Sequence, residues 1–496
     1  MNTIYKIHPA IGVCRIGDSA AWFIGPEKEG SKGVDIQANG QETEVTNFKV
    51  NGEIKRQGAR FKVWEYKVDN GVEIPVKELD SSTFIEWRVK VANTKASGNQ
   101  IIPIMDQEHE RRVLAPNGNP RNSQVANRSS LEIVSDEVLV SGANSAPAPL
   151  DQGTFLGKSV NLGDVMTDSN ANLIVLGGTG DSEGIPEVSG GPIPMLESYA
   201  NNDRWHDDVS DGYVKATIHI AGQTSVEAVS AWVVCGPPDM APGVKAPTTL
   251  HDFALAAATK RNWRTIPSVP SFSKDILPIL KRSLSMRWVH DWAYWSGITD
   301  DWAMLSNLNE DDLRSSAYDA VIDADLRRYA VTTDMKDVLT KWKDGIFIDD
   351  YANPPSETDP KILDRVAMES CIATSFFPGI DAGYTITDPA IYSEQGRLSP
   401  QAVRPGFVTR QMALPWQADW NDCRSDWWPS QRPNDVYRND GDVSNNGSVE
   451  WSRGVGGRGD PVTRQDMVDN FAKLGLIYES NSGNKLEQER DQSLPV

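Results

Sequence analysis

The chain has 496 residues and a formal net charge of -20, with 39% hydrophobic and 24% charged residues. That length can bury a large core and predicts more than one domain. The acidic balance, without a basic stripe, argues against nucleic acid and against an anionic membrane as partner. The 4 cysteines form no CxxC pair and are too few for a disulfide scaffold. No apolar run is long enough to span a membrane and no secretory signal follows Met1, so we expect a cytoplasmic protein.

The N-terminal half has the pattern of short strands separated by turns. Valine, isoleucine and aromatic residues alternate with polar ones between glycines and prolines, which is typical of half-buried strands in an antiparallel sheet. The pattern changes after Gly236-Pro237-Pro238. We therefore predict a β-rich domain over residues 1–243, with strands near residues 4–9, 11–19, 45–50, 60–68, 83–91, 131–140, 172–176, 214–220 and 228–235.

Two clusters in this half have some features of ligand-binding loops. The glycine cluster at residues 177–184 leads into Ile185-Pro186 and not into a helix, so it lacks the helix N-terminus that a phosphate loop needs. Residues 201–212 gather acidic and amide side chains that could hold Ca²⁺, but their spacing is not that of an EF-hand. We interpret the first cluster as a structural loop and the second as turns whose side chains cap nearby backbone N–H groups.

From about Pro247 the hydrophobic pattern becomes helical. Ser273 is the expected N-cap of one helix, and aromatic residues at 288, 292 and 295 would share one helix face, which favours a core role. The polar tail 484–496 is expected to fray. The fold class predicted is α+β, with a helical and loop-rich domain over residues 244–496 and helices near residues 249–259, 273–282, 329–343 and 359–375.

The usual catalytic sets are missing from this sequence. None of the 6 histidines follows His290 and no two have i, i+4 spacing, so we predict no zinc site and no other metal centre. There is no GxSxG elbow, and Cys371 has no histidine near it in the sequence. The unusual segment is 371–433, where a cysteine precedes a rigid Phe-Phe-Pro-Gly turn and tryptophans are dense in a polar context.

Short motifs run in order along nearly the whole chain: Ile7-His8-Pro9-Ala10-Ile11-Gly12-Val13, Arg15-Ile16-Gly17-Asp18-Ser19, Phe23-Ile24-Gly25-Pro26-Glu27, Thr167-Asp168, Leu173-Ile174-Val175-Leu176-Gly177-Gly178, Asn201-Asn202-Asp203, Asp207-Asp208-Val209-Ser210-Asp211-Gly212, Asp364-Arg365, Cys371, Phe376-Phe377-Pro378-Gly379-Ile380, Pro415-Trp416-Gln417-Ala418-Asp419, Trp428-Pro429 and Arg432-Pro433. Each motif alone is weak, and together they are specific. With them the chain resembles the quinoprotein amino-acid oxidase family typified by lysine ε-oxidase (LodA-like) and glycine oxidase.

This resemblance implies a protein-derived cofactor, cysteine tryptophylquinone, in which the sulfur of Cys371 is bonded to the oxidised indole of Trp428. Trp427 is the close alternative and Trp416 a more distant one. The quinone carbonyls are an electrophile that no standard side chain provides. The family chemistry is the oxidative deamination of a primary amine or amino acid, with O₂ as acceptor and with ammonia and hydrogen peroxide released. The family also implies a separate flavoprotein that matures the cofactor, and we expect a homo-oligomer.

The catalytic base should be a carboxylate whose pKa is raised in a dry aromatic pocket. Related quinone sites place an aspartate one helical turn before the cysteine, where this chain has Ala367. Asp364 lies on the same face of the predicted helix as Cys371, so we predict it as the base, with Glu369 and Asp381 as the next candidates.

Three readings of function follow from the residues and the resemblance. The first is the oxidase described above, in which the absence of a histidine between the cofactor residues disfavours glycine as substrate. The second is a quinone amine dehydrogenase that passes electrons to a protein acceptor. The third, kept open by Ala367, is a family member without the cross-link that serves as a binding or structural protein.

Overall fold

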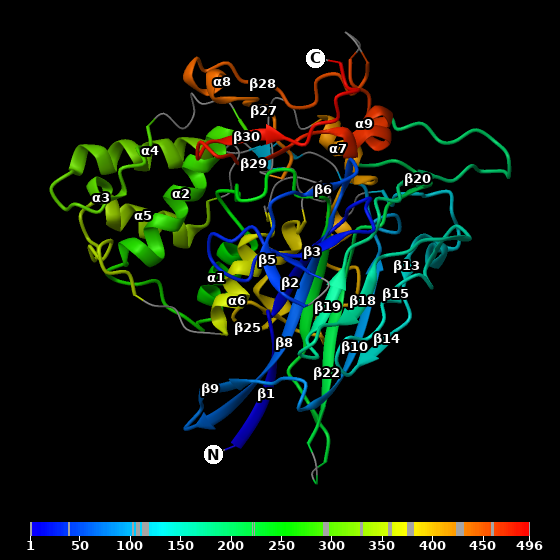
Figure 1. The fold of residues 1–496 in the computed structure, drawn as a ribbon, viewed down its shortest axis with the longest axis horizontal. Helices are drawn as coiled ribbons and strands as arrows, with labels where there is room; N and C mark the ends of the chain where they lie inside the picture. Colours follow the sequence, from blue (N-terminus) through cyan, green and yellow to red (C-terminus); the bar gives the residue numbers. More distant parts are fainter. Residues whose placement is uncertain are drawn as a thin grey trace.

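The computed structural model describes residues 2–495 apart from 38–39, 102–103, 106–109, 112–118, 221, 223, 291–296, 328–330, 356–359, 374–380, 423–430 and 458–460. One large sheet dominates the N-terminal part, and helices and loops follow it (Figure 1). This arrangement confirms the predicted α+β class. The division at residue 243 stays a prediction, because one continuous hydrophobic core contains residues from both sides of it.

The large sheet has a central path of β13-β10-β22-β24-β2-β8-β19-β18-β15, to which the other strands attach at the sides. Within the described residues its pairs are antiparallel except for β2 with β24 and β3 with β8. Its strands are β1 (Asn2–His8), β2 (Ile11–Arg15), β3 (Trp22–Ile24), β4 (Val34–Ile36), β5 (Glu42–Glu44), β8 (Arg56–Asp69), β9 (Val72–Glu78), β10 (Phe84–Asn93), β13 (Ile133–Val134), β14 (Val138–Ser141), β15 (Ala148–Pro149), β18 (Asp164–Thr167), β19 (Leu173–Leu176), β22 (Ser210–His219), β23 (Val226–Glu227) and β24 (Ala231–Gly236).

Short two-stranded hairpins lie outside the large sheet. Most of those in the C-terminal part lie beside the helices at the top of Figure 1. They are β6 (Lys49–Val50) with β7 (Glu53–Ile54), β11 (Ile104–Met105) with β12 (Glu110–Arg111), β16 (Thr154–Phe155) with β17 (Lys158–Ser159), β20 (Glu183–Gly184) with β21 (Trp205–His206), β25 (Tyr392–Glu394) with β26 (Arg397–Leu398), β27 (Asp435–Val436) with β28 (Val449–Glu450), and β29 (Leu476–Glu479) with β30 (Lys485–Gln488).

Helices α2 to α5 gather at one side of the molecule, and α1 and α6 lie against the sheet near β2 (Figure 1). Helices α7, α8 and α9 lie at the top of the view, where α7 packs with α9. Thr249 and Asp252 begin α1 with a reciprocal capping box, which satisfies free N–H groups of its first turn. The helices are α1 (Leu250–Lys260), α2 (Leu277–Ser285), α3 (Trp302–Leu305), α4 (Asp311–Arg327), α5 (Thr333–Lys343), α6 (Lys361–Glu369), α7 (Trp416–Asp422), α8 (Asp440–Ser444) and α9 (Arg464–Asn470). No helix in the described part of the chain is both long and apolar enough to cross a membrane.

Strands β2 and β24 lie at the centre of the sheet and are buried along their whole length. Both carry nearly continuous apolar runs, as parallel strands covered on two faces do. Cys14 and Cys235 face each other across this pair, and both are buried. On one face of the pair, apolar residues of β2 and β24 pack with those of α1 and with Cys371 in a cluster of their own. This packing places Cys371 against the middle of the sheet.

Several local predictions need correction. The first turn before α2 is capped by Ser271 and not by Ser273, because the Ser271 hydroxyl accepts the Lys274 N–H at 3.0 Å and a short π-helical turn precedes α2. The tail 484–496 is not frayed throughout, since β30 pairs with β29. Trp288 is buried, whereas residues 292 and 295 of the expected aromatic stripe lie outside the described residues.

The two loop clusters agree with these interpretations in part. Residues 177–182 form a loop that leads into the short strand β20 and not into a helix. Residues 205–206 and 210–212 of the second cluster lie in β21 and β22 and not in turns. The carboxylates of the second cluster accept hydrogen bonds from the protein itself. Asp208 binds the N–H groups of Gly180 and Asp181, and Asp211 binds the N–H and hydroxyl of Thr409.

Candidate active site around Cys371

Cys371 lies just beyond the end of α6, in an extended segment. The helix stops at the cap residue Ser370, whose hydroxyl donates to the carbonyl of the last turn. Ile372 then pairs with Thr249 in an antiparallel bridge. The predicted helix over 359–375 is therefore wrong at its C-terminal end, because the chain leaves the helix to form this bridge.

The thiol of Cys371 is fully buried, with its sulfur 3.9 Å from the Ile372 carbonyl oxygen and close enough to the carboxylate of Asp381 to be affected by its charge. Burial raises the pKa of the thiol well above its ordinary value, and the charge of Asp381 and its hydrogen bond with the thiol raise it further, whereas the charge of Arg15 lowers it. The sulfur is therefore protonated at neutral pH and does not have the character of a thiolate nucleophile. This environment disfavours cysteine-protease chemistry and is compatible with a sulfur that serves as an anchor.

Arg15, the last residue of β2, holds Asp381 with two nitrogens. Nη1 lies 2.6 Å from Oδ1 and Nη2 lies 2.8 Å from Oδ2, and both side chains are buried. Nη2 of Arg15 also donates to the Ser370 carbonyl at 2.5 Å, and the Ile372 N–H donates to Asp381 at 3.0 Å. The segment from 370 to 372 is thus fixed to the sheet on both sides of Cys371. Gly236 permits this approach, because a Cβ there would overlap the Asp381 carboxylate.

The chain returns to this carboxylate close to the predicted cofactor tryptophan. Nε2 of Gln431 donates to Oδ1 of Asp381 at 3.2 Å. Gln431 is the third residue after Trp428, and three residues span at most about 10 Å of extended chain. Trp427 and Trp428 themselves lie outside the described residues. The structure therefore brings Gln431, three residues after Trp428 in the sequence, to the carboxylate that acts on the Cys371 thiol.

Trp416, the more distant alternative, lies in another part of the core. It starts α7 and is fully buried, with its ring 4.6 Å from that of Trp420 and 5.1 Å from that of Phe471. These rings belong to the main core cluster, whereas Cys371 belongs to the cluster beside α1. The described contacts do not bring Trp416 to Cys371.

Asp364 is held away from the thiol by other partners. Its Oδ1 lies 2.8 Å from Nδ1 of His8 and accepts the Ala10 N–H at 2.6 Å, while Nε2 of His8 bonds the hydroxyl of Tyr66 at 2.9 Å. Burial raises the pKa of Asp364, but the charge and hydrogen bond of His8 and the charge of Arg397 lower it more, so the net pKa is below its ordinary value. Asp364 therefore serves to join α6 to the first strands.

Glu369 lies near the cysteine but is surrounded by cations. Its carboxylate oxygens are 3.0 Å from Lys245, 3.2 Å from Arg365 and 3.7 Å from Arg282. Although burial raises the pKa of Glu369, the charges of these side chains and of His251 bring it down to about 2. A carboxylate with so low a pKa is a weak proton acceptor at neutral pH.

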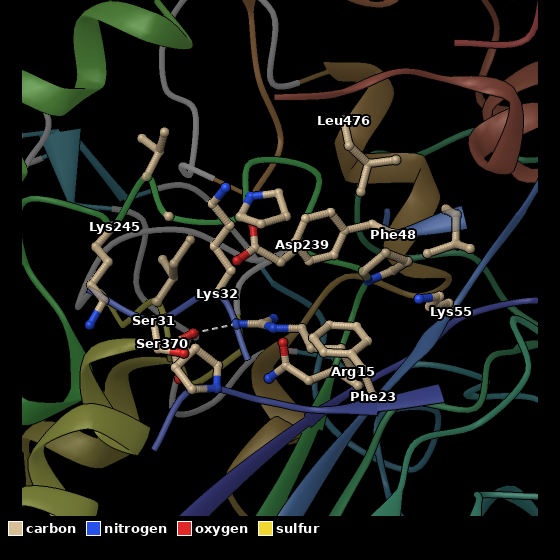
Figure 2. A pocket seen from close by; sticks show the side chains of 18 of the residues that line it. Arg15, Phe23, Ser31, Lys32, Phe48, Lys55, Asp239, Lys245, Ser370 and Leu476 are labelled. Atoms are coloured by element: carbon tan, nitrogen blue, oxygen red, sulfur yellow. Dashed lines mark hydrogen bonds between the residues drawn. The ribbon is translucent and has the colours of Figure 1, made fainter. Parts of the chain in front are cut away.

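A pocket that is partly open to solvent lies beside residues 369–372. Figure 2 shows Arg15, Asp239, Lys32 and Lys245 around it, together with the hydrogen bond from Arg15 to Ser370. Its walls come from the first strands, from the loop that follows β24 and from the end of α6. The pocket therefore lies next to the Cys371 segment, on the side where Arg15 and Ser370 meet.

Asp239 is the carboxylate of this pocket that is closest in character to a catalytic base. One oxygen accepts the Ala241 N–H at 3.0 Å. Burial raises the pKa of Asp239 above its ordinary value and the charge of Asp381 also raises it, although Arg15, the Ala241 N–H and Lys245 oppose this. A raised pKa in a pocket beside the predicted cofactor cysteine is what a general base requires.

The cationic side chains of the pocket differ in whether they form an ion pair with a carboxylate. Arg15 pairs with Asp381, Lys55 with Asp35 and Lys245 with Glu369. Lys32 has no carboxylate within ion-pair distance among the residues that the structure describes, and its nitrogen lies 5.8 Å from the centre of the Tyr478 ring. Lys32 is thus the cation at this pocket that is available to a bound anion.

Sequence reasoning missed three residues of this site. Arg15 lies in a matched motif and Gln431 lies between two of them, but the sequence does not show that both residues reach Asp381. Asp239 follows the Pro237-Pro238 pair, which marked a change of composition and was not considered for chemistry. A carboxylate directly after a buried strand and a rigid turn is the pattern that could have identified it.

Comparisons with known proteins agree with the motif pattern. The family model of the L-lysine epsilon oxidase N-terminal region matches residues 8–235, and that of the L-lysine epsilon oxidase C-terminal domain matches residues 325–439. An L-lysine 6-oxidase of Marinomonas mediterranea is 26% identical, in an alignment covering 84% of this chain and 71% of that protein.

Solved structures of the L-Lys epsilon-oxidase from Marinomonas mediterranea share the fold. One superposes with a TM-score of 0.79, and that of its Schiff base intermediate with L-Lys superposes with a TM-score of 0.78. In both cases the sequence identity is 21%, and the match covers 98% of this chain and 95% of the other. The motifs, the two family models and the shared fold lead to one conclusion: the chain belongs to the LodA-like L-lysine epsilon-oxidase family.

Proposed function

We propose that the chain is an oxidase of a primary amine or amino acid, with a cysteine tryptophylquinone formed from Cys371 and Trp428. The observation that carries this proposal is the convergence on Asp381. The Cys371 thiol lies close to this carboxylate, and Gln431, just after Trp428, donates to it. Residues from two segments far apart in the sequence therefore approach one carboxylate, and this supports a cross-link between Cys371 and Trp428.

The residues present fit such a group. Cys371 is buried, protonated and free, so its sulfur is available for a thioether. Oε1 of Gln431 is buried and has no hydrogen-bond partner among the described residues, so an acceptor remains at this place for a donor from the cofactor or its substrate. When formed, the quinone supplies an electrophilic carbonyl for the amine and an acceptor for two electrons.

The protein's own contribution begins with positioning. Arg15 and Asp381 fix the backbone on both sides of Cys371, and Gly236 leaves room for them. A site held by a buried ion pair and by backbone hydrogen bonds needs little rearrangement during the reaction. The role we propose for Arg15 and Asp381 is to hold the sulfur, and through it the indole, in one orientation.

We assign proton abstraction to Asp239. Its carboxylate would accept the proton from the carbon next to the substrate nitrogen and return it to solvent afterwards. Of the carboxylates predicted from sequence, Asp364 is bound to His8 and Glu369 has a pKa of about 2. Asp239 combines a raised pKa with a place in the pocket, so it replaces Asp364 as our candidate.

We assign the anchoring of a substrate carboxylate to Lys32. This cation at the pocket has no described carboxylate partner, and an ammonium is a good point charge for a carboxylate. An amino acid would then place its carboxylate at Lys32 and its reacting amine toward the Cys371 segment. The related L-lysine 6-oxidase of Marinomonas mediterranea makes L-lysine the first amino acid to test.

We further propose O₂ as the electron acceptor, with ammonia and hydrogen peroxide as products, and maturation of the cofactor by a separate flavoprotein. Indole oxygenation requires an oxidant that the chain does not contain, which is the reason for the second protein. We also propose a homo-oligomer, whose subunit number is open to measurement.

The decisive experiment is intact-mass analysis of the full chain, coexpressed with its maturation flavoprotein, followed by peptide mapping. The proposal predicts the sequence mass plus two oxygens less the hydrogens lost, and one cross-linked pair of peptides that contains Cys371 and Trp428. An unmodified mass after successful coexpression contradicts the oxidase and supports a binding or structural role. Peroxide production under air with L-lysine or another amine separates the oxidase from a dehydrogenase, which would consume the amine only with a protein acceptor.

A further inference from the structure

Three metal-ligating side chains lie together on the side of the molecule that carries the β20–β21 hairpin. Glu183 of β20 lies directly opposite His206 of β21, and Asp181 precedes β20 in the same loop. One possible ligand atom of each, two carboxylate oxygens and one ring nitrogen, all lie within 4.8 Å of one another. Among the described residues this is the one such cluster, and it is separate from the site around Cys371.

His206 is the unusual member of the cluster. It is buried, with 1% of its surface exposed, yet neither ring nitrogen has a hydrogen-bond partner among the described residues. A buried imidazole without any partner is rare, because its desolvated polar atoms lose the hydrogen bonds of water. Its ring packs at 5.3 Å against that of Phe155, which fixes its orientation.

The unpartnered ring nitrogens of His206 lie beside two carboxylates. One nitrogen of the ring and one oxygen each of Asp181 and Glu183 lie within 4.8 Å of one another. The three groups together therefore offer a set of N and O donors, and imidazole nitrogen is a common metal ligand.

Lys158 occupies this place in the structure described. Its ammonium pairs with Glu183 and lies 3.4 Å from Asp181, but it forms no hydrogen bond with His206. The lysine comes from the short strand β17 and its side chain is half-exposed, so it can turn into solvent without disturbing the core. Lys158 therefore neutralises the two carboxylates and leaves the imidazole unsatisfied.

We propose that Asp181, Glu183 and His206 bind a first-row divalent transition cation of the Zn²⁺ type, with water as the remaining ligand and with Lys158 displaced. Mixed imidazole and carboxylate donors suit such ions better than Ca²⁺ or Mg²⁺, which take oxygen alone. Tetrahedral bonds of about 2.0–2.1 Å place donor atoms roughly 3.3 Å apart. The donors must therefore close in, and the half-exposed carboxylates of Asp181 and Glu183 are free to do so around the fixed histidine.

The position of the cluster suggests what the ion would do. Asp208 fixes the loop through the N–H groups of Gly180 and Asp181, at 2.7 and 3.1 Å. In the same loop, Ser182 donates to Gln417 of α7 at 3.0 Å. An ion at Asp181 and Glu183 would lock this loop against α7, the helix that leads toward Trp428. The role is structural, and it does not depend on the oxidase proposal.

The test uses the purified full chain after treatment with a chelator, titrated with ZnCl₂ by calorimetry, with metal content checked by elemental mass spectrometry. The wild type should bind one Zn²⁺ per chain. D181N/E183Q should weaken binding by about tenfold or more, because two anionic ligands become neutral. K158M should strengthen it, because the competing ammonium is gone. D337N is the matched control, since Asp337 forms a comparable pair with Lys341 at another place, and it should leave binding unchanged.

Imidazole ligation has its own readout. With Cu²⁺ as probe, electron paramagnetic resonance of the wild type should show nitrogen coupling that H206Q loses. Equal Zn²⁺ binding by wild type and D181N/E183Q, or nitrogen coupling that survives in a folded H206Q, would overturn the proposal. If H206Q does not fold, the carboxylate variants and K158M decide it, because their substitutions are half-exposed. Activity plays no part in these measurements, so failure here leaves the proposed oxidase untouched.

Discussion

Arg15 and Asp381 form a two-point ion pair in the interior, with 2.6 Å between Nη1 and Oδ1 and 2.8 Å between Nη2 and Oδ2. Because both groups are buried, removing one leaves the other as an uncompensated charge. We expect D381N to lower the free energy of unfolding by about 3–5 kcal/mol, measured by chemical denaturation. D35N removes the partner of Lys55, which is less buried, and should change the free energy of unfolding by about 1 kcal/mol or less. A similar loss in both variants would contradict the importance given to this pair.

The choice between the two adjacent tryptophans can be made by mass. We expect W428F to lack the thioether and the added oxygens, because position 428 is the proposed indole. W427F should keep both, because its side chain is not part of the cofactor. The measurement is intact mass with peptide mapping of chains matured under identical conditions. The reverse pattern would move the cofactor to Trp427 and leave the role of Cys371 intact.

Asp239 as the base makes a prediction about pH. The carboxylate must be ionised to accept a proton, so activity should fall as pH drops through the pKa of Asp239, which lies above its ordinary value of 3.8. D239N should reduce kcat by about a hundredfold or more and remove this acidic limb. The control D337N should keep both the rate and the limb. If D239N leaves the rate unchanged in a chain whose mass confirms the cofactor, Asp239 is not the base.

The lowered pKa of Glu369 predicts how the free energy of unfolding depends on pH. Its pKa is lowered from 4.5 to about 2 in the folded chain, so its contribution to stability is complete above 4.5 and is lost as pH falls toward 2. The shift corresponds to about 3 kcal/mol over that window. E369Q should therefore flatten the fall of unfolding free energy with acid, measured by urea denaturation at several pH values. E187Q, at an exposed position, should follow the wild type, and a flat wild-type profile would contradict the strong pairing of Glu369.

The sequence predicted the fold class because the evidence for it is local. Alternation in residues 60–68 and 83–91 is visible in the chain itself, and those strands are present as β8 and β10. The helix predicted near residues 249–259 is likewise present as α1. Each of these features depends on neighbours within a few residues.

The arrangement of the site depends on long-range contacts, so the sequence predicted only part of it. Asp364 was favoured because it would share a helix face with Cys371, but α6 ends before the cysteine so that Ile372 can pair with Thr249. The sequence around Ile372 contains no signal that it pairs with Thr249, a residue more than a hundred positions away. Asp381 was placed behind Asp364 from sequence, together with Glu369, yet it is the candidate whose charge acts on the thiol of Cys371.

The proposed thioether between Cys371 and Trp428 has a consequence for the thermal stability of the protein. A thioether there would close a covalent ring of roughly 60 residues and restrict the denatured chain, which by loop-closure entropy is worth roughly 4 kcal/mol. The mature protein should then melt at a higher temperature than the unprocessed one, whatever substrate it meets. The melting temperature would thus show whether the cross-link has formed, before any amine is added.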